Sequence, residues 1–107
     1  MKPDTLNGQL DPLILATVAD EPAHGYAILQ HLKERSSGAF DLAEGTIYPA
    51  LLRLHQRGWI KAEWGASENN RRAKYYSLTS KGRKQLATEQ EDWQRTSAII
   101  ARLLQGT

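Results

Sequence analysis

Residues 45–79 read GTIYPALLRLHQRGWIKAEWGASENNRRAKYYSLT, and the pattern of apolar residues in this stretch decides the fold. In its first part, Ile47, Leu51 and Leu54 stand at positions i, i+4 and i+7, which places them on one face of an α-helix. Gly58 follows as a typical C-cap, because glycine readily adopts the left-handed conformation that ends a helix. The stretch therefore begins with an amphipathic helix that ends near Gly58.

The start of this helix is open between two alternatives. Pro49 fits most easily within the first helical turn, and the helix would then start only a few residues before it. Asp41 is a good N-cap several residues earlier, and a helix that begins there would be kinked by Pro49. Both alternatives keep the same apolar face.

After the helix, apolar and polar residues alternate, which is the period of a β-strand. Ile60, Ala62 and Trp64 form one side of this predicted strand. Residues 65–70 are polar and turn-forming, and residues 71–78 follow as a second strand rich in aromatic side chains. Two strands joined by one short loop predict an antiparallel hairpin.

Two more helices are predicted upstream of this stretch. Asp11 and Pro12 fit the N-cap and the first position of one helix, with an alternative start at residues 6–10. His24 and Gly25 open the other helix, which carries its own apolar positions. The chain therefore has three short helices before the hairpin.

A long helix is predicted over residues 80–104, with Thr79 as its N-cap. Six residues recur on one face of this helix at alternating spacings of four and three, as in a coiled coil. They are Leu86, Gln90, Trp93, Ser97, Ile100 and Leu104. No further element in the sequence is available to cover this stripe, so we predict that a second copy of the chain covers it. The predicted dimer interface comprises Leu86, Trp93, Ile100, Leu103 and Leu104.

The order of elements is that of a winged helix-turn-helix followed by a C-terminal helix. We therefore predict a mainly α fold with a small β-hairpin. Residues 1–79 would form a winged helix-turn-helix DNA-binding domain, and residues 80–107 a long C-terminal dimerisation helix. The second and third short helices would form the helix-turn-helix, with the third in the major groove.

The net charge of +2 conceals a strongly basic middle segment. Residues 53–84 contain 9 Lys and Arg against 2 Asp and Glu, a net charge of +7, whereas residues 1–52 have a net charge of −4. Such a block favours a polyanionic partner, here double-stranded DNA, with the wing lying along a phosphate backbone. The alternative is that these charges simply decorate a solvated surface.

Several short motifs connect the chain with a family of regulators. They are Gly25-Tyr26, Gly45-Thr46-Ile47-Tyr48-Pro49-Ala50-Leu51, Arg53-Leu54, Gly58 with Ile60, Lys74-Tyr75-Tyr76, Leu78-Thr79 and Gly82. In these motifs the chain resembles the PadR family of bacterial transcriptional regulators, over about residues 6–86. The resemblance implies a homodimeric repressor whose winged helix binds an inverted repeat and whose single C-terminal helix dimerises. His55 and Asn70 depart from the family's pattern, so contacts at the wing tip are not carried over.

The predicted DNA contacts come from the start of the second helix, the outward side of the third and the wing. When the apolar face of the third helix points inward, Gly45, Pro49 and Gln56 lie opposite it. A helix N-terminus binds phosphate, and wing cations add further phosphate contacts. The predicted DNA-binding residues are His24, Gly25, Tyr26, Thr46, Tyr48, Pro49, Arg53, Arg71, Arg72 and Lys74.

Some of these residues also have purely structural interpretations. Tyr48 could be a half-buried aromatic at the edge of the core. Arg53 could pair with an acidic side chain of its own subunit. Gly25 could allow close helix packing while Tyr26 fills the core. Only the placement of the side chains separates these interpretations from DNA contact.

Three other aromatic residues have predicted places. Tyr76 shares a strand face with Leu78 and is expected in the core, whereas Tyr75 is expected to reach either DNA or the long helix. The resemblance implies that a tryptophan on the last helix can line a pocket between subunits, so Trp93 is the predicted contact for a small aromatic effector. The alternative is that Trp93 is a dimer anchor without a ligand.

The composition argues against several classes of protein. The chain has no Cys, and its 3 His residues lack metal-ligand spacing, so we expect no metal, no cofactor and no enzymatic activity. The longest apolar run is far too short for a membrane span and the N-terminus lacks a secretory signal, which predicts a cytoplasmic protein. The alternative function is a winged-helix module that binds an acidic protein surface without specific DNA binding.

Overall fold

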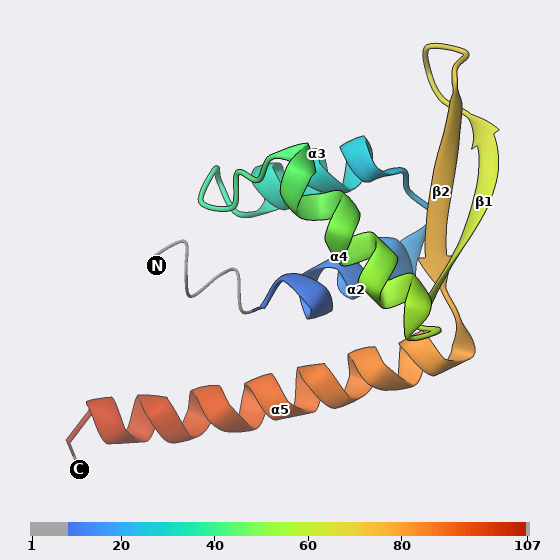
Figure 1. Cartoon of the computed structure of the whole chain (residues 1–107). Helices are drawn as coiled ribbons and strands as arrows, with labels where there is room; N and C mark the ends of the chain where they lie inside the picture. The colour runs from blue at the N-terminus through green and yellow to red at the C-terminus, as the bar shows by residue number, and fades with distance from the viewer. Residues whose placement is uncertain (1–8, 107) are drawn as a thin grey trace.

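The computed structural model describes residues 9–106 and contains the predicted series of elements (Figure 1). In chain order they are α2 (Leu10–Asp20), α3 (Gly25–Arg35), α4 (Glu44–Gln56), β1 (Ile60–Ala66), β2 (Arg72–Leu78) and α5 (Ser80–Leu104). The three short helices pack together, the hairpin stands at one side of them as a wing, and α5 extends along and beyond the group. The predicted fold class, a mainly α winged helix with one hairpin and a long last helix, is confirmed.

Helix α2 begins at Leu10, within the alternative start predicted at residues 6–10, of which residues 6–8 lie outside the described part of the chain. Gln9 occupies the N-cap position and provides no side-chain hydrogen bond, so the prediction of Asp11 as N-cap is wrong. Asp11 lies instead in the first turn, where its negative charge still interacts favourably with the positive end of the helix dipole. Its carboxylate accepts a hydrogen bond from Arg53 of α4.

Helix α4 begins at Glu44, so neither predicted start is correct. Ala43 occupies the N-cap position, and its carbonyl accepts the amide of Thr46 at 2.9 Å, which starts the helix without a side-chain cap. Pro49 is therefore inside the helix rather than in its first turn. Because proline has no N–H, it cannot donate to the carbonyl of Gly45 one turn earlier.

The predicted N-cap of α5 is confirmed, and His24, predicted only to open α3, proves to be its N-cap. His24 caps α3, and its Nδ1 accepts the amide hydrogen of Ala27 at 3.1 Å. Thr79 caps α5, and its Oγ1 accepts the amide hydrogen of Gly82 at 3.0 Å. Gly58 follows the C-cap of α4 with a φ of +77°, the left-handed conformation expected there.

The hairpin pairs Ile60 with Leu78 at its base and Ala66 with Arg72 near its tip. The second strand begins one residue later than predicted, because the carbonyl of Arg71 accepts the amide hydrogen of Ser67 at 2.8 Å within the turn. On its other edge, β2 forms an isolated bridge to the segment before α3. There the backbones of Ala23 and Tyr76 exchange two hydrogen bonds, of 3.0 and 2.8 Å. This bridge fixes the wing relative to the start of α3.

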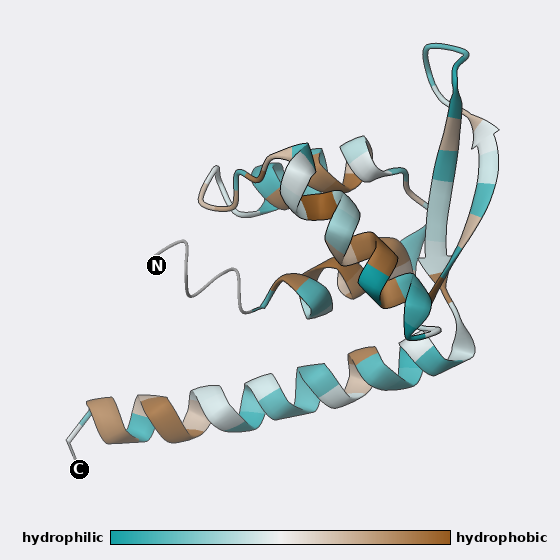
Figure 2. Cartoon of the chain, viewed as in Figure 1, coloured by the Kyte–Doolittle hydropathy of each residue, from teal (hydrophilic) through white to brown (hydrophobic). Residues whose placement is uncertain are grey.

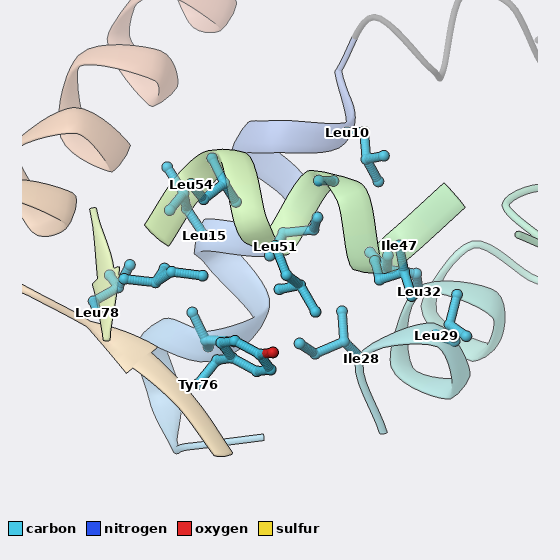
Figure 3. Packing of buried hydrophobic residues seen from close by; sticks show 14 of the residues in the cluster. Leu10, Leu15, Ile28, Leu29, Leu32, Ile47, Leu51, Leu54, Tyr76 and Leu78 are labelled. Carbon is cyan, nitrogen blue, oxygen red and sulfur yellow. The ribbon is translucent and has the colours of Figure 1, made fainter. Parts of the chain in front are cut away.

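The core lies between the three short helices and the base of the wing (Figure 3). Ile47, Leu51 and Leu54 are fully buried, which confirms the predicted inward face of α4. Tyr76 is buried in the same cluster, as its strand position predicted, and its ring points toward Ile28 in Figure 3. This packing presents the opposite face of α4 to solvent.

The first turns of α5 are attached tightly to the end of α4. A Cβ atom on Gly82 would lie 1.9 Å from the carbonyl oxygen of Trp59, so only glycine fits at this position. Nearby, the Thr79 hydroxyl donates to the Gly58 carbonyl at 2.6 Å, and Lys81 Nζ donates to the Arg57 carbonyl at 3.0 Å. Contacts with residues 57–59 therefore attach the start of α5 to the winged helix, and α5 also packs against α2.

The last turns of α5 are largely apolar and exposed, as the brown end of the helix in Figure 2 shows. Leu103 and Leu104 are 75% and 82% exposed, and Trp93 is 51% exposed. Leu86, in contrast, packs against the core of its own chain. No helix within residues 9–106 has both the length and the apolar content needed to cross a membrane.

Candidate nucleic-acid interface

An open groove runs between the start of α3 and the inner side of the wing. Seven of the ten predicted DNA-binding residues line this wing groove: His24, Gly25, Tyr26, Tyr48, Arg71, Arg72 and Lys74. They come from three elements that are distant in the sequence, α3, α4 and the hairpin. The fold therefore gathers the helix N-terminus, two tyrosines and the wing cations around one space.

Tyr48 extends from α4 across the start of α3. A Cβ atom on Gly25 would lie 2.7 Å from the Tyr48 ring, so the absence of a side chain on Gly25 is what lets the ring lie there. Tyr48 nevertheless remains 46% exposed, so it combines the packing role and the accessible position that the sequence left as alternatives. Tyr26 is exposed rather than part of the core, and its hydroxyl accepts a hydrogen bond from Gln30 at 3.0 Å.

His24 is held in place from two directions. Its Nδ1 caps α3, and its ring meets the edge of the Tyr75 ring with the centroids 5.4 Å apart. Tyr75 in turn donates its hydroxyl hydrogen to the carbonyl of Ala66 at 2.7 Å. The bridge at Ala23 places the Tyr75 ring beside His24, and contact of Tyr75 with DNA or the long helix stays a prediction.

Two wing cations are arranged on the indole of Trp64. The register pairs Trp64 with Lys74, whose Nζ lies 5.5 Å from the ring centroid, and the Arg72 guanidinium lies 4.6 Å from it. Cation–π contacts of this kind hold charged groups over the ring while leaving them hydrated. Trp64 thus orients two cations that line the wing groove, although its sequence pattern predicted only a strand position.

The outward face of α4 lies next to this groove. Thr46 and Pro49 are exposed there, as predicted, but they do not line the groove itself. Leu52 is also exposed on this face, although it was not among the predicted DNA-binding residues. A helical wheel could have found it, since Leu52 projects close to Gly45 and Pro49.

Arg53 forms an internal ion pair rather than pointing into the groove. Its Nε donates to Oδ2 of Asp11 at 3.2 Å, and Arg57 lies 3.8 Å from the same carboxylate. The hydrogen bond with Asp11 raises the pKa of Arg53, and the guanidinium stays charged. Pairing within the subunit was one of the two interpretations open from the sequence, and the structure contains that pair.

The remaining predicted residues lie on α5, away from the wing groove. Trp93, Ile100, Leu103 and Leu104 are exposed along the helix and do not line the groove. Within residues 9–106, no group of three or more His, Asp or Glu side chains is placed to hold a metal ion. The groove is lined by aromatic, backbone and cationic groups, together with the acidic side chains of Glu34 and Glu68.

Comparison with known proteins agrees with this geometry. The sequence model of the transcriptional regulator PadR-like family matches residues 14–88. A PadR-like transcriptional regulator from Bacillus cereus is 34% identical, with a TM-score of 0.86 over 97% of this chain and 99% of that chain. A transcriptional regulator from Clostridium thermocellum is 28% identical, with a TM-score of 0.85 over 95% of this chain and 96% of that chain. An uncharacterised protein from Lysinibacillus sphaericus is 29% identical over 99% of this chain and 97% of its own length. The chain belongs to the PadR-like family of transcriptional regulators, which bind DNA through a winged helix.

Proposed function

We propose that this regulator is a homodimeric repressor that binds an inverted-repeat operator. The observation that carries the proposal is the wing groove, where Tyr48, the start of α3 and the wing cations surround one space. The groove lies beside the exposed face of α4, the helix that would enter the major groove. Phosphate contacts from the groove would position α4 on the duplex, and side chains on its outer face would read the bases.

The phosphate contacts are assigned to two parts of the groove. An α-helix leaves its first amides without internal partners, and the start of α3 at Gly25 and Tyr26 supplies such amides together with the positive end of the helix dipole. Arg71, Arg72 and Lys74 supply positive charge from the wing. Contacts of both kinds add affinity for any duplex sequence, because the phosphate backbone is the same everywhere.

Dimerisation is assigned to the exposed part of α5. Trp93, Ile100, Leu103 and Leu104 leave an apolar stripe in water, which a second copy would cover with its own stripe. Two α4 helices related by a two-fold axis would meet successive major grooves about 34–36 Å apart, so the operator would be an inverted repeat. A flat aromatic effector, if it stacks on Trp93, would act at this same interface.

The experiment is a titration of the purified protein with two fluorescent duplexes, followed by anisotropy. One duplex carries the inverted repeat found upstream of the regulator's own gene or a neighbouring gene, and the other carries the same bases with the repeat scrambled. We expect tight binding of the first duplex only, by a protein that sediments as a dimer. Equal affinity for both duplexes would count against a sequence-specific repressor. Affinity no better than about 10⁻⁴–10⁻⁶ M at about 0.15 M salt would support the alternative, a module that binds an acidic protein surface.

A pair of charge variants tests the groove itself. Lys74→Ala should weaken binding of both duplexes and reduce the salt-dependence slope by about one unit, because one phosphate contact is lost. Arg35→Ala is the matched control, since Arg35 is exposed at the far end of α3 and does not line the groove. If Lys74→Ala and Arg35→Ala reduce the salt-dependence slope equally, the assignment of phosphate contacts to the wing groove is wrong.

A further inference from the structure

Leu52 is exposed in a helix whose other leucines are buried. It is 59% exposed, whereas Leu51 and Leu54 are 1% and 0% exposed. At 100° per residue, Leu52 lies on the outer face of α4 beside Pro49 and Gln56. This face therefore carries an apolar group that the core does not use.

Nothing within residues 9–106 covers this leucine. The exposed apolar stripe that would join two subunits lies on α5, a different helix from the one that carries Leu52. A single apolar side chain on a surface needs no partner by itself. Leu52, however, lies on the helix that would face the bases, and this position indicates which chemical group it would contact.

The charges around the outer face of α4 indicate that the partner of Leu52 is DNA. Tyr48, one helical turn before Leu52, lines the wing groove together with Arg72 and Lys74. A surface bordered by these cations is complementary to the sugar–phosphate backbone, and docking there brings the outer face of α4 to the base edges. In the major groove the apolar group that distinguishes one base from the others is the 5-methyl group of thymine.

We propose that Leu52 is a specificity-determining residue that packs against the 5-methyl group of a thymine in each operator half-site. The inference rests on the proposed function, because it requires α4 to enter the major groove. It deepens that function by naming the base feature that is read. Burying one methyl group against Leu52 should change the affinity about fourfold for each half-site.

The test begins with a duplex selected by the wild-type protein from a randomised 40-base-pair pool, so it requires no known operator. Each thymine of the selected duplex is then replaced by deoxyuridine, which removes the 5-methyl group and keeps base pairing. We expect that replacing one particular thymine in either half-site lowers the wild-type affinity about fourfold. Replacing this thymine in both half-sites should lower the affinity about fifteenfold. Leu52→Ala should bind the thymine and uracil duplexes equally, whereas Leu52→Met, which keeps an apolar side chain, should retain the difference.

The possible results separate this inference from the proposed function. Tight wild-type binding that no uracil replacement weakens would overturn the role of Leu52 and leave the repressor proposal intact. A Leu52→Ala protein that keeps the full uracil penalty, or that sediments as a monomer where the wild type is a dimer, would also overturn it. Failure to select any duplex from the pool would overturn both proposals. Because uracil scanning of the wild type needs no variant, the test also holds when Leu52→Ala folds poorly.

Discussion

Replacing Gly82 by Ala should strongly destabilise the protein, although the same change usually stabilises a helix. Gly82 lies in the first turn of α5, where its backbone contacts the end of α4. An added Cβ atom would lie 1.9 Å from the carbonyl oxygen of Trp59 and 3.1 Å from a methyl carbon of Leu78. The first distance is impossible for two unbonded atoms, so α5 must move away from Trp59.

The magnitude follows from the contacts that this movement breaks. Thr79 N donates to the Trp59 carbonyl at 3.1 Å, the Thr79 hydroxyl to the Gly58 carbonyl, and Lys81 to the Arg57 carbonyl. Together these bonds contribute about 2–3 kcal/mol. Overpacking adds about 1–3 kcal/mol, and the better helix propensity of alanine returns about 1 kcal/mol. The net loss of unfolding free energy is therefore about 2–5 kcal/mol.

Gly45→Ala is the matched control for this prediction. Gly45 is also helical, but nothing lies within 4 Å of the position of its added Cβ atom. It should therefore gain about 0.5–1 kcal/mol from helix propensity alone. Thermal melts followed by circular dichroism at one protein concentration should show Gly82→Ala melting about 10 °C or more below the wild type, and Gly45→Ala melting slightly above it. A Gly82→Ala protein that melts within a degree of the wild type would refute the steric reasoning.

Three further predictions follow from single contacts. Asp11→Asn removes the anionic partner of Arg53, so affinity for a scrambled duplex at low salt should rise, and unchanged anisotropy titrations would contradict this. Trp64→Leu keeps every charge but removes the cation–π contacts, so DNA affinity should fall a few-fold in the same titrations while the salt slope stays constant. A lowered slope would mean that Trp64 does more than orient the cations. Burial raises the pKa of Tyr76, and the nearby Tyr48 raises it further by a smaller amount. The folded state therefore favours the protonated phenol. Stability should be unaffected by this group below about pH 10 and should fall above it, and urea unfolding should show that Tyr76→Phe lacks this part of the fall.

The inward faces of the elements were predictable because they depend on local periodicity. The spacing of Ile47, Leu51 and Leu54 required a helix with one apolar side, and all three are buried. The position of Tyr76 on the strand face of Leu78 predicted its burial in the same way. Such patterns need no knowledge of which element packs against which, so sequence alone determines them.

The helix starts and the wing contacts were harder to predict because they depend on distant residues. Asp11 has the properties of an N-cap, but its carboxylate is engaged by Arg53 from another helix. Tyr75 was expected to reach DNA or the long helix, but a bridge from the segment before α3 places it beside His24. The cationic arrangement on Trp64 depends on the hairpin register, which the loop sequence did not fix.

The basic segment shows how counting charges along a sequence differs from locating them in space. The net charge of +7 over residues 53–84 predicted a polyanion-binding surface, but the fold uses part of that charge internally. Arg53 and Arg57 share the carboxylate of Asp11, and Lys81 donates to a backbone carbonyl at the base of α5. Arg72 and Lys74 instead face the wing groove. Because counterion release depends on the cations that reach phosphate, the DNA affinity of this protein should depend on the wing rather than on the whole segment.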